Sequence, residues 1–293
     1  MPSIKERRIR FSQNFLHDRR LVARLVARSS LESHDVVVEI GPGRGIITEA
    51  LAQRCAHVLA VEQDPHQVGV LRERFGAGGK VTVFPANFLE FPLPATDYKV
   101  FANIPYRITT AIVSKLTSGV SPPADSYLVM QREAADKFAG VSKETLVAVV
   151  LKPRFDLDIV HRFQRSDFVP APNVESVLLR LRRRGVPLLP QEHEQRFRDL
   201  VTAVFGAWQP SVDAALTGLM PHAALVGLRR RHGELLHRRP SQTPFGDWLA
   251  LFDALLAQDD QRIWKRIQGA ENRLVHQQSQ LTKQHRTRVA RSK

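Results

Sequence analysis

The chain has 293 residues, with 43 lysines and arginines against 29 aspartates and glutamates, a formal net charge of +14 and a single cysteine. No apolar run reaches the roughly 18 residues that a membrane span needs, and the charged start lacks the apolar segment of a secretory signal. Cys55 cannot form an internal disulfide, and no cysteine and histidine cluster has zinc spacing. We therefore expect a cytoplasmic protein without a bound metal.

The excess charge lies at the two ends of the sequence. Residues 1–28 carry a net charge of +6 and residues 261–293 a net charge of +8, whereas the residues between them are neutral overall. Because neutralisation of phosphates provides most non-specific affinity for nucleic acids, this distribution predicts a polyanionic partner. An acidic lipid surface, or solubility alone, would also account for the charge.

Short apolar runs alternate with segments of helical period over the first part of the chain. Residues 36–40 are almost continuously apolar, as expected for a parallel strand covered on both faces, and residues 46–51 follow at helical spacing. Further strands are predicted at 58–61, 81–84, 98–102 and 127–130, with another helix over 68–75. Repeated strand–helix units of this kind predict a doubly wound α/β fold with a parallel sheet.

The pattern changes in the second half. Residues 155–159 alternate in polarity and residues 177–181 are apolar, which predicts an antiparallel hairpin at the end of the sheet. After a linker rich in arginine and proline, apolar residues recur only at helical spacing, and the final segment has too few apolar residues to offset the entropy of ordering. We predict an α/β domain over 1–183, a small all-helical domain over 184–260 and a disordered basic tail over 261–293. Alternatively, the apolar residues Ile263, Trp264 and Ile267, at helical spacing, would dock the first part of the tail onto the helical domain.

A glycine cluster, Glu39-Ile40-Gly41-Pro42-Gly43-Arg44-Gly45, follows the first predicted strand of this series. Glycines there let the backbone approach a ligand at the carboxyl end of a strand. The dinucleotide pattern G-x-G-x-x-G does not match, because the third glycine comes one place early. The cluster instead resembles the first motif of S-adenosylmethionine-dependent methyltransferases. Glu62 then ends the next strand, where an acid would accept hydrogen bonds from both ribose hydroxyls.

Asn103-Ile104-Pro105-Tyr106 ends the predicted strand at 98–102. It resembles the N-[IL]-P-Y motif of methyltransferases that modify an exocyclic amine on a planar base. Hydrogen bonds from both amine protons to the Asn103 side-chain oxygen and the Ile104 carbonyl would favour a pyramidal nitrogen with an available lone pair. Proline holds the backbone so that the carbonyl points inward, and Tyr106 offers a face on which the base can stack.

Three more stretches, at 11–16, 131–135 and 168–176, resemble the ribosomal RNA adenine N6-dimethyltransferases, and the resemblance extends over residues 10–183. It implies S-adenosylmethionine as the cofactor, bound by Gln13, Asn14, Leu16, Gly41, Gly43, Glu62, Asn87 and Asn103. It implies contact with the target base by Asn103, Ile104, Tyr106 and, as a second aromatic wall, Phe168. Asn87 stands where the family pattern usually has aspartate, and Phe168 could instead be a core residue.

Two branches of this family share these motifs. The Erm enzymes methylate an adenine of 23S rRNA and confer resistance to macrolides, lincosamides and streptogramin B, whereas the other branch dimethylates adenines of 16S rRNA. Ile104, the extended basic tail and the absence of a basic Q-R-R-K-like run after Val204-Phe205 favour resemblance to the Erm branch. The sequence therefore predicts a monomeric enzyme that methylates N6 of a 23S rRNA adenine once or twice. The resemblance implies that residues 1–183 form the catalytic domain and that the helical domain over 184–260 binds RNA.

Three alternatives remain. One is the 16S rRNA dimethyltransferase of the second branch. A DNA adenine methyltransferase is disfavoured by Ile104 and by the stretch 11–16. A non-catalytic RNA-binding protein with a methyltransferase fold is disfavoured by the intact glycine cluster and the intact Asn103–Tyr106 motif.

Overall fold

The computed structural model describes residues 14–76, 79–258 and 260–278. The chain divides into two compact units, one formed by residues 1–139 and 155–185 and the other by residues 140–154 and 186–293. Within the part of the chain that is described, no helix is both long and apolar enough to cross a membrane.

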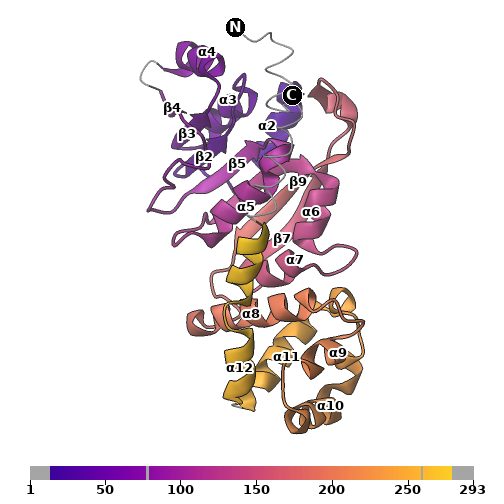
Figure 1. Ribbon diagram of the computed structural model, residues 1–293. Helices are drawn as coiled ribbons and strands as arrows, with labels where there is room; N and C mark the ends of the chain where they lie inside the picture. Colours follow the sequence, from indigo (N-terminus) through magenta and orange to yellow (C-terminus); the bar gives the residue numbers. More distant parts are fainter. Residues whose placement is uncertain (1–13, 77–78, 259, 279–293) are drawn as a thin grey trace, which may run out of the picture. The chain divides into compact units, whose positions relative to one another are not determined.

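A seven-stranded sheet forms the first unit (Figure 1). From one edge to the other its strands are β4 (Val81–Pro85), β3 (His57–Glu62), β2 (Val36–Ile40), β5 (Lys99–Asn103), β6 (Asp125–Gln131), β9 (Ser176–Arg183) and β7 (Phe155–Arg162). The pairs from β4 to β6 are parallel, whereas β9 is antiparallel to both β6 and β7. The predicted α/β sheet and its terminal antiparallel pair are confirmed, with β9 inside the sheet and β7 at its edge.

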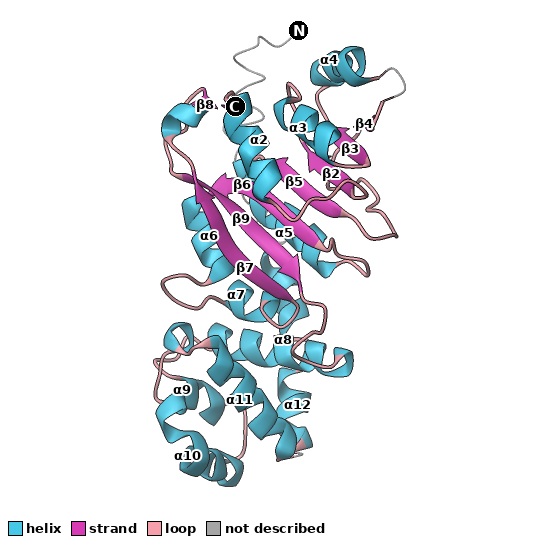
Figure 2. Cartoon of the chain, turned by 180° about the vertical axis from the view of Figure 1, so that it is seen from behind, coloured by secondary structure: helices cyan, strands magenta, loops and turns pink. Residues whose placement is uncertain are grey.

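Helices cover both faces of this sheet (Figure 2). The views from opposite sides place α5 (Thr109–Ser118) and α6 (Arg132–Ala139) on one face, and α2 (Arg19–Arg28) with α3 (Ile46–Arg54) on the other. Helix α4 (Pro65–Phe75) packs beside β4. Because both faces are covered, strand β2 buries four of its five residues, which explains why all of them except Glu39 are apolar.

A second, two-stranded sheet joins distant parts of the first unit. Strand β1 (Phe15–Leu16) pairs antiparallel with β8 (Phe168–Val169), with Leu16 opposite Phe168. After β1 the chain enters α2, whose first turn is capped by the Asp18 carboxylate, which accepts from the main-chain N–H groups of Arg20 and Leu21. This pairing holds the segment that begins at Asn14 near the loop that precedes β9.

The second unit is helical. It comprises α7 (Leu146–Leu151), α8 (Gln191–Gly206), α9 (Val212–Thr217), α10 (His222–Leu236), α11 (Phe245–Ala257) and α12 (Gln261–Ile267). The Phe252 ring in its core lies 5.3 Å from the Phe197 ring and 5.7 Å from the Trp264 ring, measured between centroids. Edge-to-face contacts of this kind add to the stabilisation from apolar burial.

The unit boundaries differ from the predicted domains in two places. Residues 140–154 were expected in the catalytic domain, but α7 buries Val149 in the core of the helical unit, so the stretch belongs there. The start of the predicted disordered tail is also ordered. Ile263, Trp264 and Ile267 are 1%, 7% and 1% exposed, and helical structure continues to residue 278. These three apolar residues lie on one face of the helix and pack into the core of the helical unit, which holds the segment in place. Residues 279–293 lie outside the described residues.

Candidate active site

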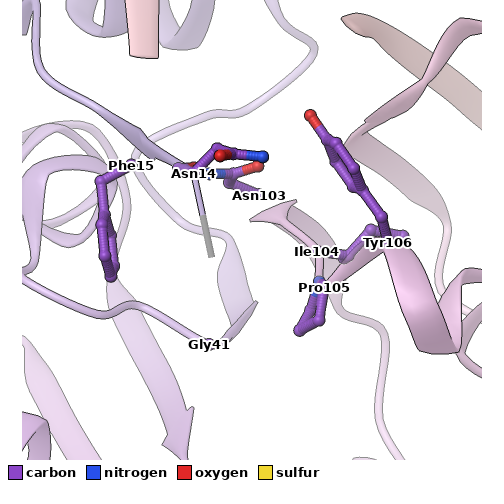
Figure 3. A pocket seen from close by; sticks show the side chains of 7 residues that line it. All are labelled: Asn14, Phe15, Gly41, Asn103, Ile104, Pro105 and Tyr106. Atoms are coloured by element: carbon purple, nitrogen blue, oxygen red, sulfur yellow. Dashed lines mark hydrogen bonds between the residues drawn. The ribbon is translucent and has the colours of Figure 1, made fainter. Parts of the chain in front are cut away.

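A pocket lies at the carboxyl ends of β2 and β5 in the first unit (Figure 3). Its lining residues are Asn14, Phe15, Gly41, Asn103, Ile104, Pro105 and Tyr106. Parallel strands end at the same edge of a sheet, and this edge is where open α/β folds bind ligands. The structure thus brings the glycine cluster and the Asn103–Tyr106 motif into one pocket and adds the N-terminal segment to it.

The glycine cluster requires left-handed backbone at two positions beside the pocket. Gly41 and Gly43 have φ values of +62° and +55°. A Cβ atom at Gly41 would have no neighbour within 4 Å, so the space beside this glycine is open. A Cβ atom at Gly43 would lie only 2.6 Å from Cε1 of Phe15, so Gly43 allows the Phe15 ring to pack onto the loop.

Glu62 holds the glycine cluster in place. Its side chain is 2% exposed, and its two carboxylate oxygens accept hydrogen bonds from the main-chain N–H of Gly43 at 3.0 Å and of Asp64 at 2.8 Å. Burial raises the pKa of the Glu62 carboxyl. Glu62 does not itself line the pocket. Each carboxylate oxygen still has a second lone pair with which to accept from a ligand.

Asn103 presents an oxygen to the pocket because its nitrogen is engaged. Its side-chain Nδ2 donates to the main-chain oxygen of Asn14 at 2.7 Å. Among the described residues nothing donates to its Oδ1. The next residue, Ile104, is buried, and its N–H donates to the carbonyl of Val129 at 3.2 Å. The strand end is thus fixed from both sides.

The half-buried Tyr106 ring stands across the pocket from Asn14 and Asn103 (Figure 3). Its hydroxyl shares a 2.6 Å hydrogen bond with the hydroxyl of Ser176, at the start of β9. Burial raises the pKa of the Tyr106 phenol. The hydrogen bond fixes the position of the ring and leaves its face toward the pocket.

Asn87 is engaged locally. Its Oδ1 accepts from the N–H of Leu89 at 3.1 Å, and its Nδ2 donates to the Glu90 carboxylate at 3.0 Å. Glu90 thereby supplies the partner that an amide needs where the family pattern has aspartate. Asn87 does not line the pocket.

Leu16 and Phe168 lie in the core. They are 5% and 2% exposed, belong to the same apolar cluster and do not line the pocket. The Phe168 ring lies 5.3 Å from that of Phe163 in an edge-to-face contact. The structure therefore places Phe168 as a core residue rather than as a wall of the pocket. Gln13 lies outside the described residues.

Sequence reasoning missed three residues at this site. Phe15 lines the pocket and contacts the glycine cluster, Ser176 positions Tyr106, and Glu39 is a buried carboxyl, 1% exposed, beside Thr48. Burial raises the pKa of Glu39 to about 8. All three lie within stretches that the sequence had marked, Glu39 at the start of the glycine cluster, but no spacing assigned them a separate role.

Comparisons with known proteins agree with this geometry. The family model described as "Ribosomal RNA adenine dimethylase" matches residues 4–255. A Streptomyces thermotolerans protein named rRNA methyltransferase is 33% identical over 244 residues, which span 83% of this chain and 81% of that protein. Ribosomal RNA small subunit methyltransferase A of Lactococcus lactis is 32% identical over 200 residues, 64% of this chain and 68% of that protein.

The fold has a close counterpart among solved structures. The crystal structure of the 23S rRNA methyltransferase ErmE aligns with a TM-score of 0.75 and 30% identity, covering 83% of this chain and 99% of that one. Together with the glycine cluster and the Asn103–Tyr106 motif in one pocket, these matches assign the family. The chain belongs to the ribosomal RNA adenine dimethylase family of S-adenosylmethionine-dependent rRNA adenine N6-methyltransferases.

Proposed function

We propose that this protein methylates N6 of an adenine in 23S rRNA, once or twice, and thereby confers resistance to macrolides, lincosamides and streptogramin B. The observation that carries the proposal is the orientation of the Asn103 amide. Because Nδ2 donates to Asn14, Oδ1 is the atom left to accept a hydrogen bond in the pocket. An exocyclic amine, which brings two donor protons, is the substrate group that this arrangement suits.

The chain's own groups would activate and hold the base. Asn103 Oδ1 and the Ile104 carbonyl accept the two N6 protons, which withdraws the nitrogen lone pair from the ring and makes it nucleophilic. Tyr106 stacks against the flipped base, an interaction worth about 1–3 kcal/mol. The methylated amine is acidic enough to lose its proton to water, so no strong base is required. Phe168 would support the loop from the core.

The residues present fit S-adenosylmethionine. The open space where a Gly41 side chain would stand suits a ligand that passes close to the backbone. The methionine end of the cofactor would lie beside Gln13, Asn14 and Leu16. Its central part and ribose would lie along Gly41, Gly43 and Glu62, and its adenine would lie at Asn87. When bound, this cofactor supplies an electrophilic methyl group on a sulfonium. Glu62 would accept from the ribose hydroxyls while keeping its bonds to Gly43 and Asp64.

A 23S target is favoured over a 16S target by two features. The solved relative named as a 23S rRNA methyltransferase aligns over nearly its whole length. The segment Val204-Phe205-Gly206-Ala207-Trp208 also lacks the basic run expected for the small-subunit branch. The relative named as a small-subunit methyltransferase keeps a 16S rRNA adenine as the second candidate.

Primer extension distinguishes the candidates. The chain and its Asn103→Ala variant are expressed in a host without the modification, and reverse-transcription stops are mapped on both rRNAs. We expect a stop at one adenine of 23S rRNA, present with the wild type and absent with Asn103→Ala, together with resistance to all three drug classes. A stop only in 16S rRNA would assign the small-subunit function. Because an adenine with a single N6 methyl still pairs with thymine and need not stop the polymerase, transfer of a labelled methyl group from S-adenosylmethionine to each rRNA is measured as well; neither a stop nor label in either rRNA would contradict both functions.

A further inference from the structure

The helical unit contains a pocket of its own, between α8 and α12, which we call the α8–α12 pocket. Its cavity volume is about 230 Å³, against about 20 Å³ for the pocket at Asn103. This is smaller than the roughly 300–1,000 Å³ of sites that bury a drug-sized ligand, so the α8–α12 pocket suits part of a larger ligand. Gln195 and Arg196 of α8 line it, with Gln261, Trp264 and Lys265 of α12 and with Gln268 after that helix.

The wall formed by α12 is held firmly. Asp199, which is 4% exposed, accepts from the main-chain N–H groups of Gly269 and Glu271 at 3.0 Å each. The Glu271 carboxylate in turn accepts from Arg198 at 2.9 Å. Asp199 is the acidic residue that lines the pocket, and its two oxygens are thus already bound to backbone donors. These hydrogen bonds fix the shape of the pocket and hold the Asp199 carboxylate against the backbone that follows α12.

Two cations face this pocket without acidic partners. The guanidinium carbon of Arg196 lies 5.6 Å from the centroid of the Trp264 ring, a cation–π contact that orients the group but leaves its charge unneutralised. Neither Arg196 nor Lys265 forms an ion pair with any residue in the described ranges. By contrast, Arg262, on the same helix as Lys265, pairs with Asp260 at 2.9 Å.

We propose that the α8–α12 pocket binds a nucleotide of the RNA substrate. The planar guanidinium of Arg196 can bind a phosphate through two parallel hydrogen bonds, and Lys265 adds a second charge from the facing helix. The Gln195 amide nitrogen already donates to Glu271 at 3.2 Å, which leaves its oxygen as an acceptor, and the Gln268 amide adds a donor and an acceptor for a base edge or a ribose. This inference rests on the proposed function, because that function supplies the RNA, and it adds a second RNA contact far along the chain from Asn103.

RNA binding by full-length variants tests the proposal. The pocket variant is Arg196→Gln with Lys265→Gln. The matched control is Arg230→Gln with Arg262→Gln, which removes the same charge from exposed positions of the same unit that do not line the pocket. The dissociation constant of a 23S rRNA transcript is measured for each over a salt series. We expect the pocket variant to bind at least about 10-fold more weakly than the control, with a salt slope lower by about 1.4–1.8 than that of the wild type.

Equal dissociation constants and equal slopes for the two variants would overturn the proposal. So would a loss of binding to vesicles of anionic phospholipid without a loss of binding to RNA, because the site would then serve a membrane surface. Thermal melts check that each variant folds. If the double variant has a lower Tm than the wild type, Lys265→Gln alone is used, because it leaves the Arg196–Trp264 contact intact. It is compared with Arg262→Gln by the same criteria.

Methylation separates this proposal from the proposed function. If the function is wrong, the wild type methylates no rRNA adenine at any RNA concentration. If only the pocket assignment is wrong, the wild type methylates its target, and the pocket variant and the control reach half-maximal single-turnover rate at the same RNA concentration.

Discussion

The Asn103 side-chain nitrogen donates to the main-chain oxygen of Asn14 over 2.7 Å, between residues 89 positions apart in the sequence. This hydrogen bond sets which end of the amide faces the pocket. It also connects the N-terminal segment to the end of β5, so that the residues proposed for the cofactor and those proposed for the base share one anchor.

Replacing Asn103 by alanine removes the acceptor proposed for the adenine amine. We expect turnover to fall by about 100-fold or more, by analogy with the loss of one transition-state hydrogen bond, while the affinity for S-adenosylmethionine falls much less. Single-turnover methylation and calorimetry measure the two quantities. If the affinity for S-adenosylmethionine fell by as large a factor as the turnover, Asn103 would act mainly by holding Asn14.

Tyr106→Phe and Ser176→Ala remove the same hydrogen bond from its two sides. We expect both to keep most activity and to lower stability by about 1 kcal/mol each. Tyr106→Ala should additionally lose about 1–3 kcal/mol of base stacking, seen as a higher KM for RNA and a lower kcat. If Tyr106→Phe were as inactive as Tyr106→Ala, the hydroxyl rather than the ring would be the functional group.

Alanine at Gly41 and at Gly43 should act differently although both have positive φ, which costs about 1–2 kcal/mol with any side chain. Gly41→Ala places its methyl group in open space and should mainly weaken cofactor binding. Gly43→Ala brings a methyl group against the Phe15 ring and should mainly lower Tm. Adding Phe15→Leu to Gly43→Ala should restore part of the lost Tm; no restoration would argue against the Phe15 contact as the cause.

Glu39 makes stability depend on pH. Burial raises its pKa from 4.5 to about 8, so the folded protein holds a proton that the unfolded chain releases above pH 4.5. The contribution of Glu39 to stability is therefore fully present below pH 4.5 and is lost as pH rises from 4.5 to about 8, by at most about 1.4 kcal/mol per pH unit. Urea unfolding at pH 5 and pH 8 should show a smaller difference for Glu39→Gln than for the wild type. An identical difference would mean that Glu39 is ionised in the folded protein.

Truncation tests the docked part of the basic tail. Ending the chain after Asp260 removes Ile263, Trp264 and Ile267 from the core, and we expect Tm to fall by on the order of 10 °C. Ending it after Gln278 removes five basic residues but keeps this helix. That form should keep its Tm and bind RNA more weakly, with a flatter salt dependence. An unchanged Tm after the first truncation would contradict docking.

Much of the fold follows from local patterns. Three features are recognisable because each depends on neighbours in sequence. The strand at 36–40 is apolar except at Glu39, the glycine cluster has backbone freedom, and the Asn103–Tyr106 motif has a proline directly after a strand. The edge of a parallel sheet then places the ends of successive strands together without further information.

Other features arise from contacts that no local pattern encodes. The Phe168 ring could have faced a ligand or the core, and only the pairing of β1 with β8 decides that it is buried. From the sequence, residues 140–154 were expected in the α/β domain. In the structure they belong to the helical unit, because Val149 is buried in the core of that unit.

The sequence by itself therefore determined the fold class, the family resemblance and the motif residues, since these depend on residue type and short-range spacing. Only the tertiary structure decided that Asn14 orients Asn103, that Ser176 holds Tyr106, that Glu62 holds the glycine cluster and that the tail docks through Trp264. The physical reason is that hydrogen-bond partners and burial depend on which distant segments the folded backbone brings within a few ångströms, and spacing along the chain does not specify them.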